Sequence, residues 1–481
     1  MFRRPISGAA LAALLTTTPA LADDKDYKQN ALCVNGNDKI CSTLPADLTG
    51  LTVTLGYNPN TNPSKPGNAV TQINFDYFAW QMFIALNWPA DAGGKPAKQM
   101  IGQDPTAPRV WESYKTPAQV YPGNAAPSTC NKGGRLVLSQ TSKLTTNSFI
   151  EPFTPYPLID SAGNFVVYDI RMNDVEADYI VQNGLQTKQG QQKFAQAWNF
   201  PKGKGSNPGA LEMKTAWRVF SDPKAAKGFF TVPGVVEVAA ENSATGQPLC
   251  LEVTLGLVGM HIMQKISTPS DFSDYWVWGT FEHVANAPLA ANATPSGVNG
   301  NAVSPPEKPL ASCPIPGKAR GTWSFFDARC TKNGQSCEAN EPPAKPKGGQ
   351  YLWSATAPYA QEYLTDQKYG TQAVRCWRVY ETANQVTDQF QTALGDTVWK
   401  NYRLIGAQWA QGASEGTPSI APYSAPFYLT NTTLETYLQI NEIGIKPHLG
   451  GAPGSCIACH NMAKDAAGNV SDFSFLSGYA Q

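Results

Sequence analysis

The apolar positions of the chain fall into a few strongly patterned runs, separated by polar stretches rich in Pro, Gly and Asn. Residues 74–87 are almost continuously apolar, which predicts a helix buried on most sides. Apolar side chains recur at spacings of three and four within 379–394, which predicts an amphipathic helix closed by Gly395. A capping-box pattern at Thr432 and Glu435 predicts a further short helix near the C-terminus.

Runs rich in β-branched and aromatic residues predict a larger number of strands. In chain order these runs are 134–139, 164–170, 234–241, 249–265 and 274–283. A short helix is predicted at 190–198, and the stretches 286–321 and 335–349 lack periodicity and predict long loops. The pattern as a whole predicts an α+β fold, a β-rich body with several packed helices.

The first 22 residues have the organisation of a cleaved secretory signal peptide. Arg3 and Arg4 precede a short apolar run from Ile6 to Leu15, and the small residues of 20–22 fit a signal-peptidase site. The apolar run is far shorter than the roughly 20 residues that a membrane-spanning helix needs. We therefore expect export to the periplasm and no transmembrane segment.

Charge and cysteine content narrow the possible partners. Removing the signal peptide takes two arginines from the 37 basic residues and leaves 35 against 37 acidic ones, with no basic block for nucleic acid or anionic membranes.

Eight of the ten cysteines lie outside the CxxCH motif described next, an even number that predicts disulfides in an oxidising compartment. Cys33 and Cys41 close a short turn, and we expect them to pair. Cys313, Cys330 and Cys337 lie close together and suggest local stapling of loops, with a zinc site as the alternative.

A CxxCH motif comprises Cys456, Cys459 and His460. Two thiols at this spacing reach the two vinyl groups of one porphyrin, and the adjacent imidazole becomes the proximal iron ligand. A redox dithiol is the alternative, but it would be followed by a long helix, and only 21 residues follow His460. We expect one covalent haem c, held by a C-terminal segment, 431–481, that packs on a body formed by 23–430.

The second axial ligand is left open by the sequence. Besides His460 the chain contains His261, His283 and His448, and a histidine on a strand is often a structural residue. We rank His261 first as an iron ligand, followed by His283, a methionine, His448 and an open coordination site. With an open site, Glu282 or His283 would be the expected acid–base groups.

Three segments carry a resemblance to a known family. They are 455–478 (SCIACHNMAKDAAGNVSDFSFLSG), 256–265 (GLVGMHIMQK) and 276–288 (WVWGTFEHVANAP), and they resemble exported bacterial proteins of the cytochrome c family with one haem motif near the C-terminus. That family has no characterised function to carry over. The resemblance implies that His261 and the run 280–283 are motif positions that serve the haem pocket.

Two classes of function follow from these expectations. The first is periplasmic electron transfer with a redox partner protein. The second is a haem-dependent oxidoreductase, peroxidase- or oxygenase-like, whose large body binds a small-molecule substrate. A haem-containing sensor or binding protein is a third possible function. No catalytic triad and no flavin or nicotinamide fingerprint is visible. Trp276, Trp278 and the aromatic-rich stretch 377–409 are expected to be core and sheet-face residues rather than electron relays.

Overall fold

The computed structural model describes the chain in separate ranges. They are 40–46, 67–121, 130, 136–138, 156–266, 275–295, 298–299, 302–303, 312–317, 319, 321–344, 350–409, 428–440, 455–460 and 462–481. The signal peptide, Cys33 and His448 lie outside these ranges, so the predictions that rest on them stay predictions. Within the described ranges, no helix is both long and apolar enough to span a bilayer.

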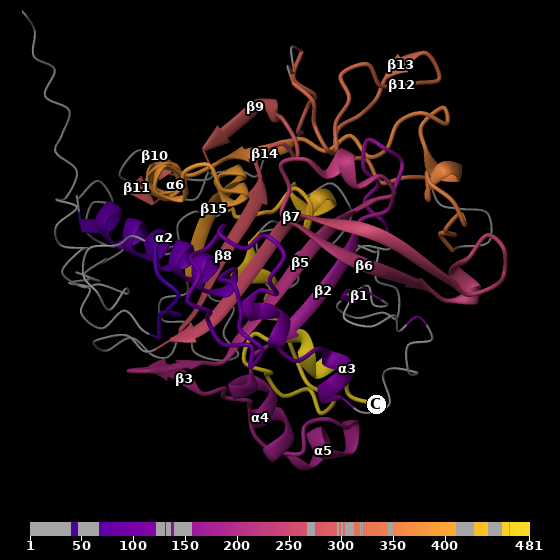
Figure 1. Cartoon of the computed structure of the whole chain (residues 1–481). Coiled ribbons are helices and arrows are strands. Elements are labelled where there is room, and N and C mark those ends of the chain that lie inside the picture. The colour runs from indigo at the N-terminus through magenta and orange to yellow at the C-terminus, as the bar shows by residue number, and fades with distance from the viewer. Residues whose placement is uncertain are drawn as a thin grey trace, which may run out of the picture.

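A nine-stranded sheet forms the centre of the molecule (Figure 1). Its strands are β1 (Leu136–Leu138), β2 (Val167–Met172), β3 (Lys202–Lys204), β4 (Asn207–Gly209), β5 (Leu211–Phe220), β6 (Thr231–Val238), β7 (Leu249–Ile266), β8 (Tyr275–His283) and β15 (Tyr402–Trp409). The long strand β7 pairs antiparallel with β5, β6 and β8. Strand β2 continues the sheet beyond β5, and β15 continues it beyond β8.

Two helices, α2 (Gly67–Leu86) and α6 (Glu381–Leu394), pack together on one face of this sheet (Figure 1). Trp80 of α2 stacks on Phe390 of α6 at 5.0 Å between ring centroids and meets the edge of Phe281 on β8 at 5.1 Å. A Cβ atom at Gly279 would lie 2.9 Å from the Ala79 Cβ, so a glycine there permits the close approach of α2 to β8. The main hydrophobic core lies between these layers.

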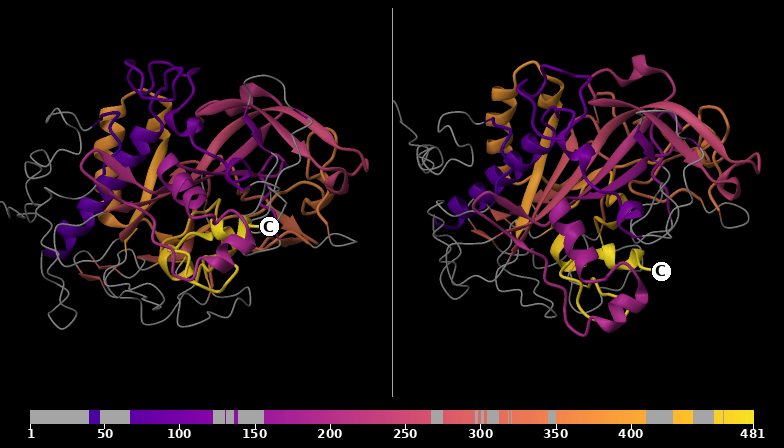
Figure 2. Two further views of the ribbon diagram at one scale, coloured as in Figure 1. Left: turned by 90° about the horizontal axis from the view of Figure 1, so that it is seen from below. Right: turned by 60° about the horizontal axis from the view of Figure 1, so that its bottom comes forward.

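The C-terminal residues pack on the opposite face of the sheet. Ile457, Phe473 and Leu476 share a buried cluster with Trp276 and Trp278 of β8. The helices α4 (Asp174–Gln182) and α5 (Lys188–Lys193) lie beside this stretch, which is drawn in yellow in Figure 2. Backbone hydrogen bonds from residue 198 to residue 470 (2.9 Å) and from residue 188 to residue 481 (3.1 Å) tie the two parts together.

Strand β7 has a bulge of one extra residue where it pairs with β5. Ala216 is opposite Gly259, and Trp217 is opposite Leu257, so Val258 is the inserted residue. Because side chains alternate between the faces of a strand, one inserted residue exchanges the faces for everything that follows it. The bulge therefore changes which side chains face the core.

The burial of β7 follows this exchange. Leu255 and Leu257 belong to the main core before the bulge, whereas Met260 and Ile262 belong to it afterwards. The odd-numbered His261 and Met263 consequently face the C-terminal segment. Without the inserted residue, they would point into the main core.

Several sequence predictions are confirmed. The described residues form a β-rich sheet body with few helices, as expected for an α+β fold. The helix predicted at 74–87 is α2, which begins earlier, and all its residues from 75 to 86 are buried. The helix predicted at 379–394 is α6, and Gly395 ends it with a φ of 56°. Strands β6, β7 and β8 lie where three of the strands were predicted.

Other predictions were wrong in detail. The capping box does not form, because the Glu435 carboxylate accepts the N–H of Asn431 instead, and only a short 3-10 helix (Thr436–Leu438) follows. The helix predicted at 190–198 is α5, which ends at Lys193. The two predicted loops contain short strands. In the first, β9 (Leu289–Pro295) pairs with β14 (Arg375–Arg378), and β10 (Val298–Asn299) pairs with β11 (Ala302–Val303). In the second, β13 (Gln335–Ser336) pairs with β12 (Thr331–Lys332), which precedes it.

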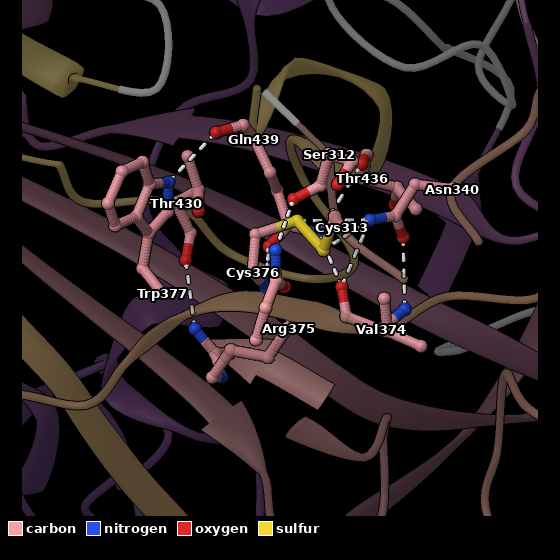
Figure 3. Close-up of a disulfide and its surroundings, with 11 residues drawn as sticks. Ser312, Cys313, Asn340, Val374, Arg375, Cys376, Trp377, Thr430, Thr436 and Gln439 are labelled. Carbon is pink, nitrogen blue, oxygen red and sulfur yellow. Dashed lines mark hydrogen bonds between the residues drawn. A yellow bond between two sulfur atoms is a disulfide. The ribbon is translucent and has the colours of Figure 1, made fainter. Parts of the chain in front are cut away.

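Three disulfides join the described residues. They are Cys130–Cys250, Cys313–Cys376 and Cys330–Cys337. The expected local stapling is confirmed for Cys330–Cys337, which closes the β12–β13 hairpin. Cys313 instead reaches Cys376 on β14, because β14 pairs with the neighbouring strand β9 and brings the two thiols together (Figure 3).

The lengths of the closed loops predict different contributions to stability. The Cys313–Cys376 disulfide closes 63 residues and Cys330–Cys337 closes 7. Chain entropy predicts losses of about 4 and about 2 kcal/mol, respectively, when each pair is replaced by alanines. Denaturant unfolding of the two double variants measures this difference. Equal losses would show that loop entropy does not dominate.

Candidate functional site

A pocket lies between the sheet and the C-terminal segment. It is lined by β5, β7 and β8, by residues 428–440, and by 455–460, which contain the CxxCH motif. The structure thus places Cys456, Cys459 and His460 together in the wall of one pocket.

The sheet register determines which side chains form the floor of this pocket. Two rows cross the strands: Lys214, His261 and Thr280 in the first, and Glu212, Met263, Trp278 and Gln408 in the second. Met213 also borders the pocket, but its side chain belongs to the main core on the other face. Among the described methionines of the lining, Met263 is therefore the one on the pocket face.

The short helix α7 (Cys456–His460) is held against the sheet by Gln408 of β15. The Gln408 Oε1 accepts hydrogen bonds from the Ile457 backbone N–H (3.0 Å) and the Ser455 hydroxyl (3.3 Å). The first turn of the motif is therefore fixed to the end of a strand that the sheet already positions.

The His460 ring is oriented by a backbone carbonyl. Its Nδ1 donates to the Phe473 oxygen at 2.7 Å, and the ring packs edge-on against Trp278 (5.6 Å) and Phe475 (5.1 Å). A carbonyl oxygen only accepts, so Nδ1 carries the proton and the neutral ring has its lone pair on Nε2. Metal-binding histidines commonly use their other ring nitrogen in this way.

His261 forms a partly buried pair with Glu435. Its Nε2 donates to both carboxylate oxygens, at 2.8 and 2.9 Å. Burial raises the pKa of Glu435, but the His261 imidazole and its hydrogen bond outweigh this effect and hold the pKa below its usual value, with the Asn431 N–H and Lys214 contributing. Glu435 is therefore an ionised acceptor. The buried Nδ1 of His261 has no hydrogen-bond partner among the described residues.

Glu435 reaches His261 because residues 428–440 lie directly on the sheet. A Cβ atom at Gly259 would come within 2.2 Å of the Thr433 hydroxyl oxygen, so any other residue there would displace the Thr433 side chain. Asn431 fixes the same turn by donating to the Thr280 hydroxyl (3.1 Å) and to the Phe281 carbonyl (2.8 Å).

The other end of this segment is anchored to β14, beside the disulfide (Figure 3). Gln439 accepts the Cys376 N–H at 3.0 Å through its side chain and the Trp377 indole N–H at 2.8 Å through its carbonyl. Arg375 donates to the Thr430 carbonyl at 3.3 Å. The Cys313–Cys376 disulfide therefore supports the strand that positions one wall of the pocket.

The structure places His283 away from the pocket lining. Its Nε2 donates to the Gly228 carbonyl (3.0 Å), its Nδ1 accepts the Ala285 N–H (3.2 Å), and its ring stacks on Phe229 at 4.0 Å. Burial lowers its pKa to about 4, with the charges of Arg218 and Arg403 adding to the effect and the Gly228 hydrogen bond opposing it. Both ring nitrogens serve the fold, so the geometry does not support His283 as an iron ligand.

Glu282 is also engaged in the fold rather than in the pocket. Its buried carboxylate forms an ion pair with Arg375 and accepts the Thr432 N–H at 2.5 Å. A second arginine, Arg403, lies 3.9 Å from its other oxygen. The expected acid–base role of Glu282 is therefore not supported, and the carboxylate beside the pocket histidine is Glu435.

Sequence reasoning missed several residues of the pocket. Glu435 was interpreted as a helix cap, and Trp278 as part of the sheet face. Lys214 and Glu212 lie on β5, a strand that the pattern did not predict. The sequence shows that His261 and Met263 share one face of a strand, but the bulge decides which face of the sheet that is.

The burial of His283 predicts a specific pH dependence. An unfolded histidine takes up a proton near pH 6.5, whereas folded His283 does so near pH 4. The folded state is therefore disfavoured as pH falls from 6.5 to 4, by on the order of 3 kcal/mol, and unaffected above 6.5. His283→Gln removes the titrating group and retains an N–H that can donate to the Gly228 carbonyl. Denaturant unfolding at several pH values should show a shallower loss in this variant; identical profiles would contradict the assignment.

Comparison with known proteins does not assign the chain to a family. No family model, curated protein or solved structure matches the chain. Within the described residues, no group of three or more His, Cys, Asp and Glu side chains is arranged around a metal position. The site is therefore interpreted from its motif and its own contacts.

Proposed function

We propose that this protein is a periplasmic c-type haem protein that acts in electron transfer. One covalent haem would lie in the pocket, joined to Cys456 and Cys459, with His460 as the proximal ligand. The observation that carries the proposal is the His460 ring, which lines the pocket together with both motif cysteines and has its Nδ1 hydrogen-bonded to the Phe473 carbonyl. The three disulfides are compatible with the oxidising compartment.

The buried polar atoms of the pocket fit such a group. The His261 Nδ1 and the Trp278 Nε1 are buried and have no partner among the described residues, which is unusual for native proteins. Lys214 supplies a positive charge for a haem propionate, with its ammonium 4.8 Å over the Tyr168 ring. Trp278, Met263 and Leu429 supply apolar surface.

His261 would be the second side chain that holds the haem iron in this proposal. Its Nε2–H donates to Glu435, so Nδ1 is the nitrogen that would bind the iron through its lone pair. A carboxylate on the far nitrogen makes an imidazole a stronger donor. Met263, two residues further along the same face, is the alternative. When bound, the haem supplies one-electron chemistry at its iron, and these side chains orient it and exclude water.

One observation keeps a haem-dependent oxidoreductase as the second candidate. The His261–Glu435 pair is a partly buried histidine–carboxylate couple in the pocket, whereas Glu282 and His283 were the groups expected to act. If His261 does not bind the iron, this couple is positioned to move a proton to or from a bound small molecule. The two functions therefore differ in what His261 contacts.

Covalent attachment tests the central proposal. The mature protein, produced with haem-ligation machinery, should retain its haem through acid–acetone extraction, and its mass should increase by one haem. The Cys456→Ser, Cys459→Ser double variant should lose the haem to extraction. The matched Cys330→Ser, Cys337→Ser variant removes a disulfide and should retain it. Loss of haem from the unmodified protein, or failure to bind any, would refute the proposal.

Optical spectra test the axial ligand. The ferric and ferrous protein should be low-spin, and His261→Ala should make it high-spin and open to carbon monoxide, because one strong ligand is removed. Met263→Leu and His283→Gln should leave the spectrum unchanged. A high-spin Met263→Leu variant beside a low-spin His261→Ala variant would instead identify Met263 as the ligand. A high-spin unmodified protein would favour the oxidoreductase.

A further inference from the structure

Aromatic side chains from three segments of the chain form a continuous path next to the motif histidine. We propose that this path carries electrons between the pocket and the surface near α4, an inference that rests on the proposed haem at His460 and adds its route. The rings are Trp278 and Trp276 on β8, Phe200 and Trp198 in the loop before β3, and Tyr179 on α4.

The ring-to-ring distances are short along the whole path. Trp278 lies 5.6 Å from His460 and 6.5 Å from Trp276, measured between ring centroids. Phe200 follows at 6.0 Å from Trp276, and Tyr179 lies 4.8 Å beyond it. Trp198 forms a branch at 5.8 Å from Phe200.

Burial changes along the path in the way that an electron route requires. Trp276 and Trp278 are each 2% exposed, and Phe200 is 1% exposed, so water does not surround the inner rings. Tyr179 is only partly buried and lies on the outer helix α4. One end of the path therefore meets the pocket wall and the other meets solvent, where a redox partner can dock.

Two of the indoles donate hydrogen bonds to carboxylates. The Trp276 Nε1 donates to Asp472 at 3.1 Å, and the Trp198 Nε1 donates to Asp465 at 3.1 Å. A nearby negative charge stabilises the positive charge that an indole acquires when it loses one electron. Lys265, 2.6 Å from Asp472, offsets part of this effect at Trp276.

Core packing explains why these rings are buried but not which acceptors they use. Other buried indoles satisfy their N–H groups with neutral acceptors: Trp377 uses the Gln439 carbonyl, and Trp80 uses the Thr387 hydroxyl. Carboxylate acceptors on two tryptophans that both contact Phe200 therefore favour a redox role. In the proposed transfer Trp278 and Trp276 would be oxidised in turn as an electron passes from the bound haem to a one-electron oxidant at the surface. Phe200 would not be oxidised; it fills the gap through which the electron tunnels between Trp276 and Tyr179. No bond is made or broken.

Flash photolysis measures this transfer. Photogenerated ruthenium(III) tris-bipyridine serves as the one-electron oxidant, and the loss of the ferrous haem band reports the rate. Trp276→Phe should slow the reaction at least about tenfold, because phenylalanine is much harder to oxidise and each roughly 59 mV is a factor of ten. Trp276→Tyr restores an oxidisable ring with Asp472 as proton acceptor and should recover part of the rate.

The matched control is Trp399→Phe, which changes a buried tryptophan packed in the main core on the other face. It should leave the rate unchanged. Haem retained after acid–acetone extraction is measured first in every variant, so an absent haem counts against the proposed function and not against the route. The route would be overturned if the haem is covalently attached and its oxidation is as fast in Trp276→Phe as in the unmodified protein. Equal slowing by Trp276→Phe and Trp276→Tyr would also overturn it, since that indicates a packing effect.

Discussion

At Val258 the central strand β7 has one residue more than β5, and its other edge changes partner from β6 to β8. Backbone groups at such a change lose their regular ladder and need other partners. Two side chains supply them: the Tyr402 hydroxyl donates to the Leu257 carbonyl at 2.9 Å, and Asn286 donates to the Val258 carbonyl at 2.7 Å. The bulge is therefore stabilised by polar groups from two other parts of the chain.

The pocket depends on this bulge through a short series of contacts. The exchange of faces turns His261 toward the C-terminal segment, and Gly259, directly after the inserted residue, lets residues 428–440 lie flat on the strand. That close approach brings Glu435 within hydrogen-bond distance of His261. A shift of one residue in β7 would bury the imidazole in the apolar core without its carboxylate, at a large cost in free energy.

The sequence predicted the parts of the fold that local pattern controls. Helix α6 carries its own periodicity, and α2 and β7 are marked by long apolar runs. The CxxCH spacing predicts its chemistry without any fold. Strand β5 could not be predicted, because its pocket face carries buried charged residues such as Glu212 and Lys214, whose partners come from elsewhere. From the sequence alone, charged side chains such as these are expected to be exposed to solvent.

His261 and His283 show the same limit at the level of the site. Both lie on central strands and are almost fully buried, so pattern and composition describe them alike. What separates them is the chemistry of their partners. His283 uses both ring nitrogens on neutral backbone groups, which holds its pKa low, whereas His261 places one nitrogen on an ionised carboxylate and turns the other to no protein group that the structure describes. An imidazole held in this way is a strong electron donor, and electron donation and nearby negative charge both favour ferric over ferrous iron. Glu435 would therefore lower the reduction potential of the proposed haem, and Lys214 beside it would offset part of that effect.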